Sequence, residues 1–473
     1  MSILTSILLF LSFPPFNWWY FAFFAFVPLF LVISNKKSYI RVIYGLISGF
    51  IFYAFSLYWI KNVAGFIYLL IPLYLCFYWG IFVFLVFSFD DKKIIFLGSC
   101  IWFFIEILIA NLLTGFPWLA LGLSQYKNIK LLKIAKFTGI YGISFLVIGT
   151  NFFLYTLFKR KFLYQKIFFL LFLIFLFLLT EFPEKMSFKG KLRILIYQPN
   201  FVPSEITLEE NKKKIIYFFE KNLNEENKKE DIDIVILPEG AFQENLFENI
   251  DLLNKLKEIS QKNKCGIVIG CFTRKNGNFY NSSIFINGNR LELYNKIHLV
   301  PYGEFILGER FKFIKDIFLK VAGYYPNLKK GDEYKIFEYK GIKFSTLICY
   351  ENIFSELVIN FLEKGSDFFI VITNDSWFGK STGPYQHFSH NIFRAIETGR
   401  YFLQAGLTGI TGIVNPEGKI EKFFEKNGEK LFVEGFLLYE LPVFIYNTFY
   451  SKYGVYPFFI FCLILTGFIV CRK

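Results

Sequence analysis

Three residues in the second half of the chain have the types and positions that a nucleophilic site needs. Cys349 and Glu239 each follow an apolar run typical of a buried strand, and Lys296 lies in a polar turn. A thiol attacks as its thiolate, so a nucleophilic cysteine needs a base and benefits from a nearby cation. A carboxylate, an ammonium group and a thiol, each at a predicted strand end, therefore indicate nucleophilic catalysis.

Taken singly, each of these residues also has an ordinary structural explanation. Glu239 would then be a capping carboxylate, Lys296 a surface charge and Cys349 a packed thiol, because free cysteines are usually buried. Together the three are a base, a cation and a soft nucleophile. That combination favours a catalytic site over three unrelated structural roles.

The elements that must position these residues belong to an α/β domain. From Lys191 onward, short β-rich runs alternate with helical patterns. The predicted strands are 192–197, 232–237, 266–272, 283–286, 344–348 and 368–373, and the predicted helices lie near 206–227 and 246–263. Strands interleaved with helices over about 250 residues indicate a domain in which helices cover the sheets.

The chain as a whole is too apolar for an ordinary soluble protein. It has 473 residues, of which 54% are hydrophobic and 22% aromatic, and a mean hydropathy of +0.42. We expect about eight membrane spans, or seven if the short first stretch does not cross, because a bilayer core needs about 20 apolar residues per helix. The apolar stretches are 2–13, 17–34, 40–60, 65–88, 94–113, 137–158, 166–182 and 454–471.

The basic residues in short loops predict how these spans are oriented. Most of them face the cytoplasm if the N-terminus lies inside, and the main exceptions are Lys61, Lys127, Lys130, Lys133 and Lys136. We therefore predict transmembrane helices one to seven in 1–185, an extracytoplasmic catalytic domain in 186–448 and a C-terminal transmembrane helix in 449–473. The expected location is the inner (cytoplasmic) membrane, with the domain in the periplasm.

The cysteines, histidines and charged residues argue against several other classes of protein. Seven cysteines lack the spacing of a disulfide framework or a zinc site, and three histidines leave little material for a metal site. We expect neither a metal nor a cofactor. The net charge of +14 favours anionic lipid headgroups over nucleic acid. Glu106 is the chief ionisable residue inside the spans, which argues against a transporter, and the aromatic connection 115–125 favours a membrane-surface anchor.

The order Glu, Lys, Cys and its surroundings resemble the carbon-nitrogen hydrolase, or nitrilase, superfamily. The shared elements are Pro238-Glu-Gly240, Asn295-Lys296 with Gly303-Glu304, Cys349-Tyr-Glu351, Thr373-Asn-Asp-Ser-Trp-Phe-Gly379, Gly383-Pro-Tyr-Gln-His387 and Arg394-Ala-Ile-Glu-Thr-Gly-Arg400. The resemblance covers residues 192–440 and implies an αββα sandwich.

The resemblance also implies catalytic roles, and for Glu239, Lys296 and Cys349 the chemistry of the side chains agrees with them. Glu239 would take the Cys349 proton, and Lys296 would stabilise the thiolate and the later oxyanion. Glu304 and Glu351 carry over by motif position as supporting carboxylates that orient Lys296 and stabilise charge. Tyr350 would support the site from within the same motif.

One branch of that superfamily combines such a domain with membrane spans, and the chain resembles this branch, the apolipoprotein N-acyltransferase family, over nearly its whole length. The added support comes from Phe13-Pro-Pro-Phe16, the segment from Gly115-Phe-Pro-Trp118 to Gln125, and Leu299-Val-Pro-Tyr-Gly-Glu304. Two departures concern lipid or acceptor positioning. The segment 405–411 lacks the family's asparagine, and no tryptophan closely follows 198–200.

The resemblance implies a ping-pong acyl transfer. A phospholipid, typically phosphatidylethanolamine, would give its sn-1 acyl chain to Cys349 as a thioester, and the α-amine of a lipoprotein's diacylglyceryl-cysteine would then take it. A thioester suits this order because it reacts with amines more readily than an oxygen ester does. We expect a monomer.

The segment 305–325 is rich in aromatic residues, and two readings of it stay open. It is either an amphipathic helix packed on the domain or a lid that dips into the lipid and gates acyl entry through Phe311 and Phe318. Trp377 is a further candidate for substrate binding. The alternative function is a membrane-tethered nitrilase-type amidase that acts on a small amide or nitrile.

Overall fold

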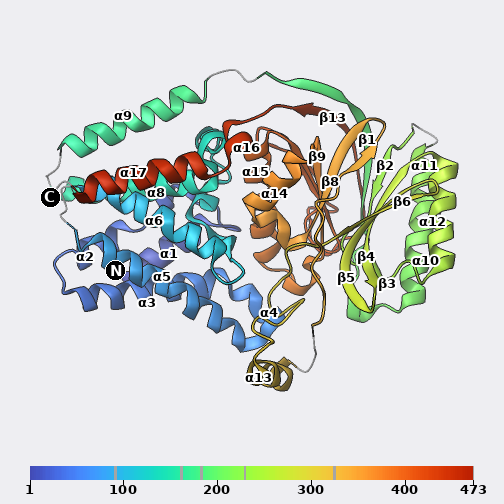
Figure 1. Ribbon diagram of the computed structural model, residues 1–473, viewed down its shortest axis with the longest axis horizontal. Helices are drawn as coiled ribbons and strands as arrows, with labels where there is room; N and C mark the ends of the chain where they lie inside the picture. The colour runs from blue at the N-terminus through green and yellow to red at the C-terminus, as the bar shows by residue number, and fades with distance from the viewer. Residues whose placement is uncertain (90–92, 160–162, 182–184, 228–230, 323–325, 472–473) are drawn as a thin grey trace. The chain divides into compact units, whose positions relative to one another are not determined.

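The computed structural model describes residues 1–89, 93–159, 163–181, 185–227, 231–322 and 326–471 (Figure 1). The chain forms two compact units that alternate along the sequence. The helical unit comprises Met1–Lys185, Ser381–Gly399 and Asn447–Lys473, and the sandwich unit comprises Met186–Lys380 and Arg400–Tyr446. The chain therefore leaves the sandwich unit after Lys380 and returns to it at Arg400.

The helical unit is built from strongly apolar helices. Four of its described helical segments are long and apolar enough to cross a membrane, namely Ser38–Ser56, Tyr58–Val86, Ile94–Asn111 and Ala135–Phe158. Shorter apolar helices occupy Ser2–Ser12, Trp19–Ile33, Leu163–Leu179 and Tyr456–Cys471. The labelled helices are α1 (Ser2–Ser12), α2 (Val27–Ile33), α3 (Ser38–Ser56), α4 (Lys61–Ala64), α5 (Leu70–Val86), α6 (Ile94–Asn111), α7 (Ile129–Leu132), α8 (Ala135–Phe158), α9 (Leu163–Leu179), α15 (Gly383–Thr398), α16 (Phe449–Tyr453) and α17 (Tyr456–Cys471).

Small and aromatic residues pack these helices closely. A Cβ atom added to Gly49 on α3 would lie 2.9 Å from the Trp79 ring on α5, so the glycine allows the two helices to approach. Phe30 on α2 stacks on Phe152 of α8 with ring centroids 4.3 Å apart. Dispersion between such side chains holds helices together where the surrounding solvent is itself apolar.

The connection 115–125 is buried, which corrects its interpretation as a surface anchor. It consists of short 3-10 turns, and residues 117–125 are all buried. Irregular backbone inside a membrane bundle needs side chains to satisfy its polar groups. The N–H of Leu121 donates to Glu106 Oε1 (2.7 Å), and the N–H of Gly122 donates to Ser144 Oγ (2.7 Å). Glu106 of α6 and Ser144 of α8 thus hold the connection in place.

The sandwich unit contains two sheets. The first has the strand order β13-β1-β2-β4-β5-β6 with β3 paired to β4, and the second has the order β12-β11-β10-β9-β8-β7. The strands are β1 (Ser187–Gln198), β2 (Ile234–Ile236), β3 (Phe242–Asn245), β4 (Gly266–Lys275), β5 (Asn278–Asn287), β6 (Arg290–Asn295), β7 (Phe337–Tyr339), β8 (Ile342–Ile348), β9 (Phe368–Thr373), β10 (Tyr401–Gly406), β11 (Gly412–Val414), β12 (Ile420–Phe423) and β13 (Gly435–Ile445).

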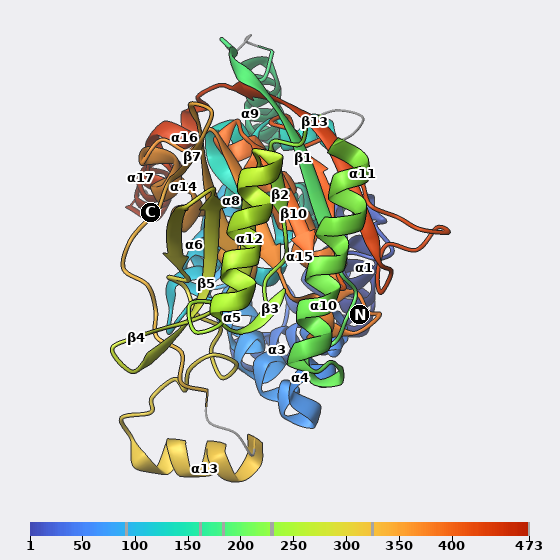
Figure 2. The same ribbon diagram turned by 90° about the vertical axis from the view of Figure 1, so that its right-hand side faces the viewer.

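Aromatic side chains join the two sheets face to face. Phe285 of β5 lies 5.7 Å from Phe337 of β7 and 5.2 Å from Phe344 of β8, measured between ring centroids. Figure 2 shows α12 (Ile250–Asn263) beside the continuous helical stretch of α10 (Leu208–Phe218) and α11 (Asn224–Asn227), over the outer face of the first sheet. α14 (Ser355–Glu363) follows β8 on the side of the second sheet (Figure 1). Two facing sheets with helices outside them confirm the predicted α/β class.

Helix α15 belongs to the helical unit although the sequence analysis places its residues inside 186–448. Every residue of α15 except Tyr385 is buried. The side chain of Gln386 accepts hydrogen bonds from the indole N–H groups of Trp59 (3.0 Å) and Trp118 (2.9 Å), and it donates to the carbonyl of Ser56 (3.0 Å). An amphipathic pattern shows that a helix buries one face but not which neighbours cover it, so the sequence left this assignment open.

A buried ion pair also fixes α15 to α8. Gly139 adopts non-helical angles (φ 65°) inside α8, so a new helical run begins at Ile140. The N–H of Ile140 donates to Glu397 Oε1 (2.8 Å), and Glu397 pairs with Arg394 at 2.8 Å. A carboxylate at a helix start satisfies a free N–H group and the helix dipole together. Arg394 balances the charge of that carboxylate.

Candidate active site

Cys349 lies at a strained turn at the end of β8. The strand pairs in parallel with β9, and its last five residues are buried. Cys349 has φ +52°, in the left-handed region that non-glycine residues rarely adopt, while Ile348 and Tyr350 on either side are buried. Such strain persists where the surrounding structure fixes it, often at functional sites. The turn leaves Cys349 partly exposed, as a nucleophile requires.

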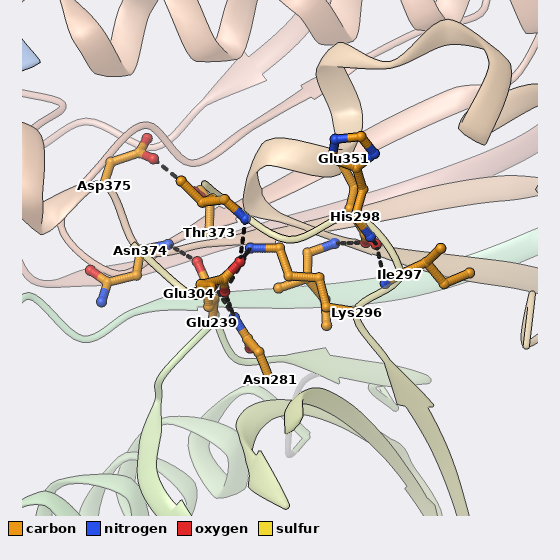
Figure 3. Close-up of polar contacts among 12 residues, drawn as sticks. Glu239, Asn281, Lys296, Ile297, His298, Glu304, Glu351, Thr373, Asn374 and Asp375 are labelled. Carbon is orange, nitrogen blue, oxygen red and sulfur yellow. Dashed lines mark hydrogen bonds and ion pairs between the residues drawn. The ribbon is translucent and has the colours of Figure 1, made fainter. Parts of the chain in front are cut away.

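Glu239 is held by hydrogen bonds to both of its oxygens. It follows β2, and its carboxylate accepts from the side-chain amide of Asn281 (2.7 Å) and from the N–H of Asn374 (2.7 Å) (Figure 3). Burial raises the pKa of Glu239, and the nearby Lys296 lowers it in part. A carboxylate fixed in this way, with a raised pKa, is suited to act as a general base.

Lys296 is almost completely buried between two carboxylates. Its Nζ lies 3.0 Å from Glu304 and 3.8 Å from Glu239 Oε1. Burial lowers the pKa of Lys296, but Glu304 and Glu239 outweigh that effect, so the net shift is upward and the side chain stays charged. The side-chain amide of Asn281 donates to both carboxylates and fixes them relative to each other. The ammonium group is therefore a fixed positive charge.

Glu351 connects the turn of Cys349 with the turn of Lys296. Its Oε1 accepts from the Tyr294 hydroxyl (2.7 Å) and from the N–H groups of Ile297 (2.7 Å) and His298 (3.1 Å), and its Oε2 accepts from the N–H of Ile348 (2.8 Å). Figure 3 shows Glu351 pointing at this turn. The carboxylate therefore joins β6 and the turn after it to the end of β8, because donors from all three converge on it.

The environment of the thiol keeps Cys349 protonated at rest. Burial raises the pKa of Cys349 well above its ordinary value, and Glu239 raises it further, whereas Lys296 and the hydroxyl of Thr373 lower it. Thr373 also donates to Asp375 Oδ1 (2.7 Å), and an Asp375 oxygen lies within 4.8 Å of the Cys349 sulfur. The thiol proton must therefore leave as attack occurs, which requires a base beside it.

The remaining predicted residues have different surroundings. Tyr350 is buried and contacts Phe354 with ring centroids 5.1 Å apart. Phe311 and Trp377 are exposed, with 47% and 57% of their surface accessible. Phe318 lies on α13 (Lys312–Ala322), and its side chain falls outside the described part of the structure. The two described aromatic residues therefore offer apolar surface to their surroundings.

Sequence reasoning missed several residues that hold the cluster together. Asn281 bridges two carboxylates from the middle of β5, and Tyr294 donates to Glu351 from β6. Asn281 lies inside its strand and Tyr294 is the next-to-last residue of β6, so nothing in the sequence indicated which partners they contact. Asn374 and Asp375 were visible within the quoted Asn-Asp-Ser-Trp-Phe element, and their position directly after β9 was the available clue.

Comparisons with known proteins match both units. Residues 5–153 match the family model "Apolipoprotein N-acyltransferase N-terminal domain", and residues 208–433 match the model "Carbon-nitrogen hydrolase". An apolipoprotein N-acyltransferase of Wigglesworthia glossinidia brevipalpis is 32% identical over 97% of this chain and 95% of its own length.

Two further relatives carry the same name. The protein of Geobacter metallireducens is 28% identical over 96% of this chain and 91% of its own length, and that of Aquifex aeolicus is 32% identical over 89% and 94%. The matches span both units, and they confirm the resemblance found in the sequence. The chain therefore belongs to the apolipoprotein N-acyltransferase family.

Proposed function

We propose that this chain moves an acyl chain from a phospholipid to the N-terminal amine of a lipoprotein through a thioester on Cys349. The observation that carries the proposal is the fixed pair of Glu239 and Lys296, 3.8 Å apart, in the same electrostatic environment as the Cys349 thiol. The pair supplies a base for the thiol and a charge for the oxyanion.

The first half-reaction forms the thioester. The sulfur of Cys349 attacks the sn-1 ester carbonyl while Glu239 takes the thiol proton, and Lys296 stabilises the oxyanion. When the tetrahedral intermediate collapses, the glycerol oxygen leaves and takes the proton from Glu239. The lysophospholipid departs and the acyl group stays on sulfur.

The second half-reaction transfers the acyl group to nitrogen. The α-amine of the diacylglyceryl-cysteine attacks the thioester and loses a proton to Glu239, and Lys296 again stabilises the oxyanion. The thiolate of Cys349 then leaves and takes the proton back. The products are an N-acylated lipoprotein and the free enzyme.

Finer assignments follow from this reaction. We place the eight apolar helical segments across the inner membrane, with the sandwich unit in the periplasm, where lipoproteins emerge. Phosphatidylethanolamine is the proposed donor, and the proposed active form is a monomer. Exposed Phe311 on the loop before α13, together with Phe318 and Trp377, would contact acyl chains.

Helix α13 is proposed as a lid over the acyl entrance. It has a strongly amphipathic sequence, Lys-Phe-Ile-Lys-Asp-Ile-Phe-Leu-Lys-Val-Ala, and lies away from both sheets of its own unit (Figures 1 and 2). Phe313 is 64% exposed. An amphipathic helix of this kind can lie in the membrane interface with its apolar face in lipid.

The decisive experiment is intact mass measurement after incubation of purified protein with phospholipid. We expect an acyl adduct that is absent from Cys349→Ser and that a diacylated lipopeptide removes. Removal by water alone, with no lipopeptide product, would instead support a hydrolase of the nitrilase type. The match of residues 5–153 to the N-terminal domain of the acyltransferase family does not favour that small-amide alternative.

A further inference from the structure

The helical unit contains one buried carboxylate that the proposed reaction does not use. Among the described residues of that unit, the carboxylates are Glu106, Glu181 and Glu397. Glu181 is exposed, and Glu397 pairs with Arg394. Glu106 on α6 is 4% exposed, and no cationic side chain in the described part of the unit forms an ion pair with it. A carboxylate inside a membrane bundle is costly, so it is a functional candidate that needs a partner.

The two oxygens of the Glu106 carboxyl group have different surroundings, and the Ser144 side chain also hydrogen-bonds to this group. Its Oε1 accepts from the indole N–H of Trp102 (2.8 Å) and from the N–H of Leu121 (2.7 Å). Its Oε2 is buried and has no hydrogen-bond partner among the described residues. The first oxygen therefore has a structural role, and the second is the acceptor that a ligand would use.

Glu106 faces a crevice whose other walls are aromatic. Tyr53, Trp102, Phe116 and Tyr141 line the crevice together with Glu106. Its free interior takes a group about the size of one water molecule, which suits an ammonium group and excludes an acyl chain. Aromatic faces with a carboxylate are the surroundings that stabilise an organic cation.

We propose that the Glu106 crevice is a recognition site for the primary ammonium group of a lipid substrate. The ammonium donates to Glu106 Oε2 and lies against the surrounding rings. Glu106 is five residues before the end of α6, about 8 Å along the helix, so in the proposed orientation the crevice lies just below the outer surface. The inference rests on the proposed function, in which both lipid substrates enter from that leaflet.

The ethanolamine headgroup of the donor carries such a group away from the reacting ester. The α-amine of the acceptor must reach the thioester as a neutral nucleophile, so Glu106 cannot hold it as an ammonium group during transfer. An effect on thioester formation therefore supports the inference, and an effect on discharge of the thioester alone would contradict it.

The test compares Glu106→Gln with wild type in reconstituted vesicles. Glutamine keeps an oxygen for Trp102 and Leu121 but removes the charge and the second acceptor, so the fold is retained and cation binding is lost. The matched control is Glu181→Gln, the same change at an exposed position. Thermal unfolding of each variant checks that the helical unit is intact.

In the donor arm, thioester formation is measured with phosphatidylethanolamine and with its N-acetyl derivative, whose amide nitrogen carries no charge. In the acceptor arm, a preformed thioester is discharged by a diacylated lipopeptide. We expect Glu106→Gln to slow the donor arm about tenfold while the acceptor arm stays within about twofold. If the donor arm responds, N-acetylation should slow wild type but not the variant.

Unchanged rates in both arms, in a variant that unfolds at the wild-type temperature, would overturn the inference and leave the proposed function standing. Lipid binding gives an independent reading. Native mass spectrometry of Cys349→Ala, with and without Glu106→Gln, compares retention of phosphatidylethanolamine and the N-acetyl lipid. Absence of any thioester in wild type would contradict the proposed function, whereas equal retention of the two lipids would contradict the ammonium site.

Discussion

At the residue scale, the thiol and its base have opposing effects that can be measured. In the proposed mechanism Glu239 removes the Cys349 proton, yet its negative charge raises the pKa of that thiol. Activation would then depend on proton transfer during attack rather than on a standing thiolate.

Glu239→Gln should change acylation and alkylation in opposite directions. Removing the negative charge lowers the pKa of Cys349, so iodoacetamide should modify the variant faster near neutral pH, with its half-maximal rate at lower pH than in wild type. Acyl transfer should fall by about 10²–10⁴ because the general base is lost. Intact mass measured across about pH 6 to 10 follows alkylation. Exposed Glu338→Gln is the control, and slower alkylation of Glu239→Gln would contradict the assigned environment.

Glu351→Gln should unfold at lower temperature and lose activity together. Both oxygens of Glu351 accept hydrogen bonds from buried donors, and an amide would place an N–H group against one of them. We expect a loss of about 2–3 kcal/mol in unfolding free energy. Glu356→Gln, at an exposed position of α14, should change neither property. A fully stable but inactive Glu351→Gln would instead point to a direct chemical role.

At the element scale, the position of α13 suggests how lipid entry is controlled. Replacing Phe311 and Phe313 by serine should slow thioester formation from membrane phospholipid about tenfold, because the apolar face loses its affinity for lipid. A short-chain, soluble ester should react at the wild-type rate. Lys312→Ser is the matched control on the same segment. Equal slowing with both substrates would show that the residues act on the site itself and not on entry.

Helix α15 should be essential to the helical unit. Gln386→Ala removes the acceptor shared by the indoles of Trp59 and Trp118, and we expect a loss of about 3 kcal/mol in unfolding free energy. Thermal unfolding followed by tryptophan fluorescence measures it. Lys452→Ala, at an exposed position of the same unit, provides the baseline. Wild-type stability of Gln386→Ala would argue against the assignment of α15 to this unit.

At the scale of the whole molecule, the sequence predicted those features that depend on residues close together in the chain. Apolar stretches indicated the helices, and strand ends marked Glu239, Lys296 and Cys349. Asn281 and Tyr294 escaped notice because their importance comes from partners that are distant in sequence. The grouping of α15 with the membrane helices could not be predicted either, since burial of a helix face does not identify the surface that covers it.

The position of α15 in the chain also fixes when the helical unit can be completed during synthesis. The ribosome completes α3, α6 and α8 long before residue 386 exists, so during that interval the indoles of Trp59 and Trp118 lack their shared glutamine, and Ile140 lacks the carboxylate of Glu397. In the proposed orientation, these helices stay incompletely packed while residues 186–380 cross the membrane. Completion of the helical unit would then depend on export of the first part of the sandwich unit.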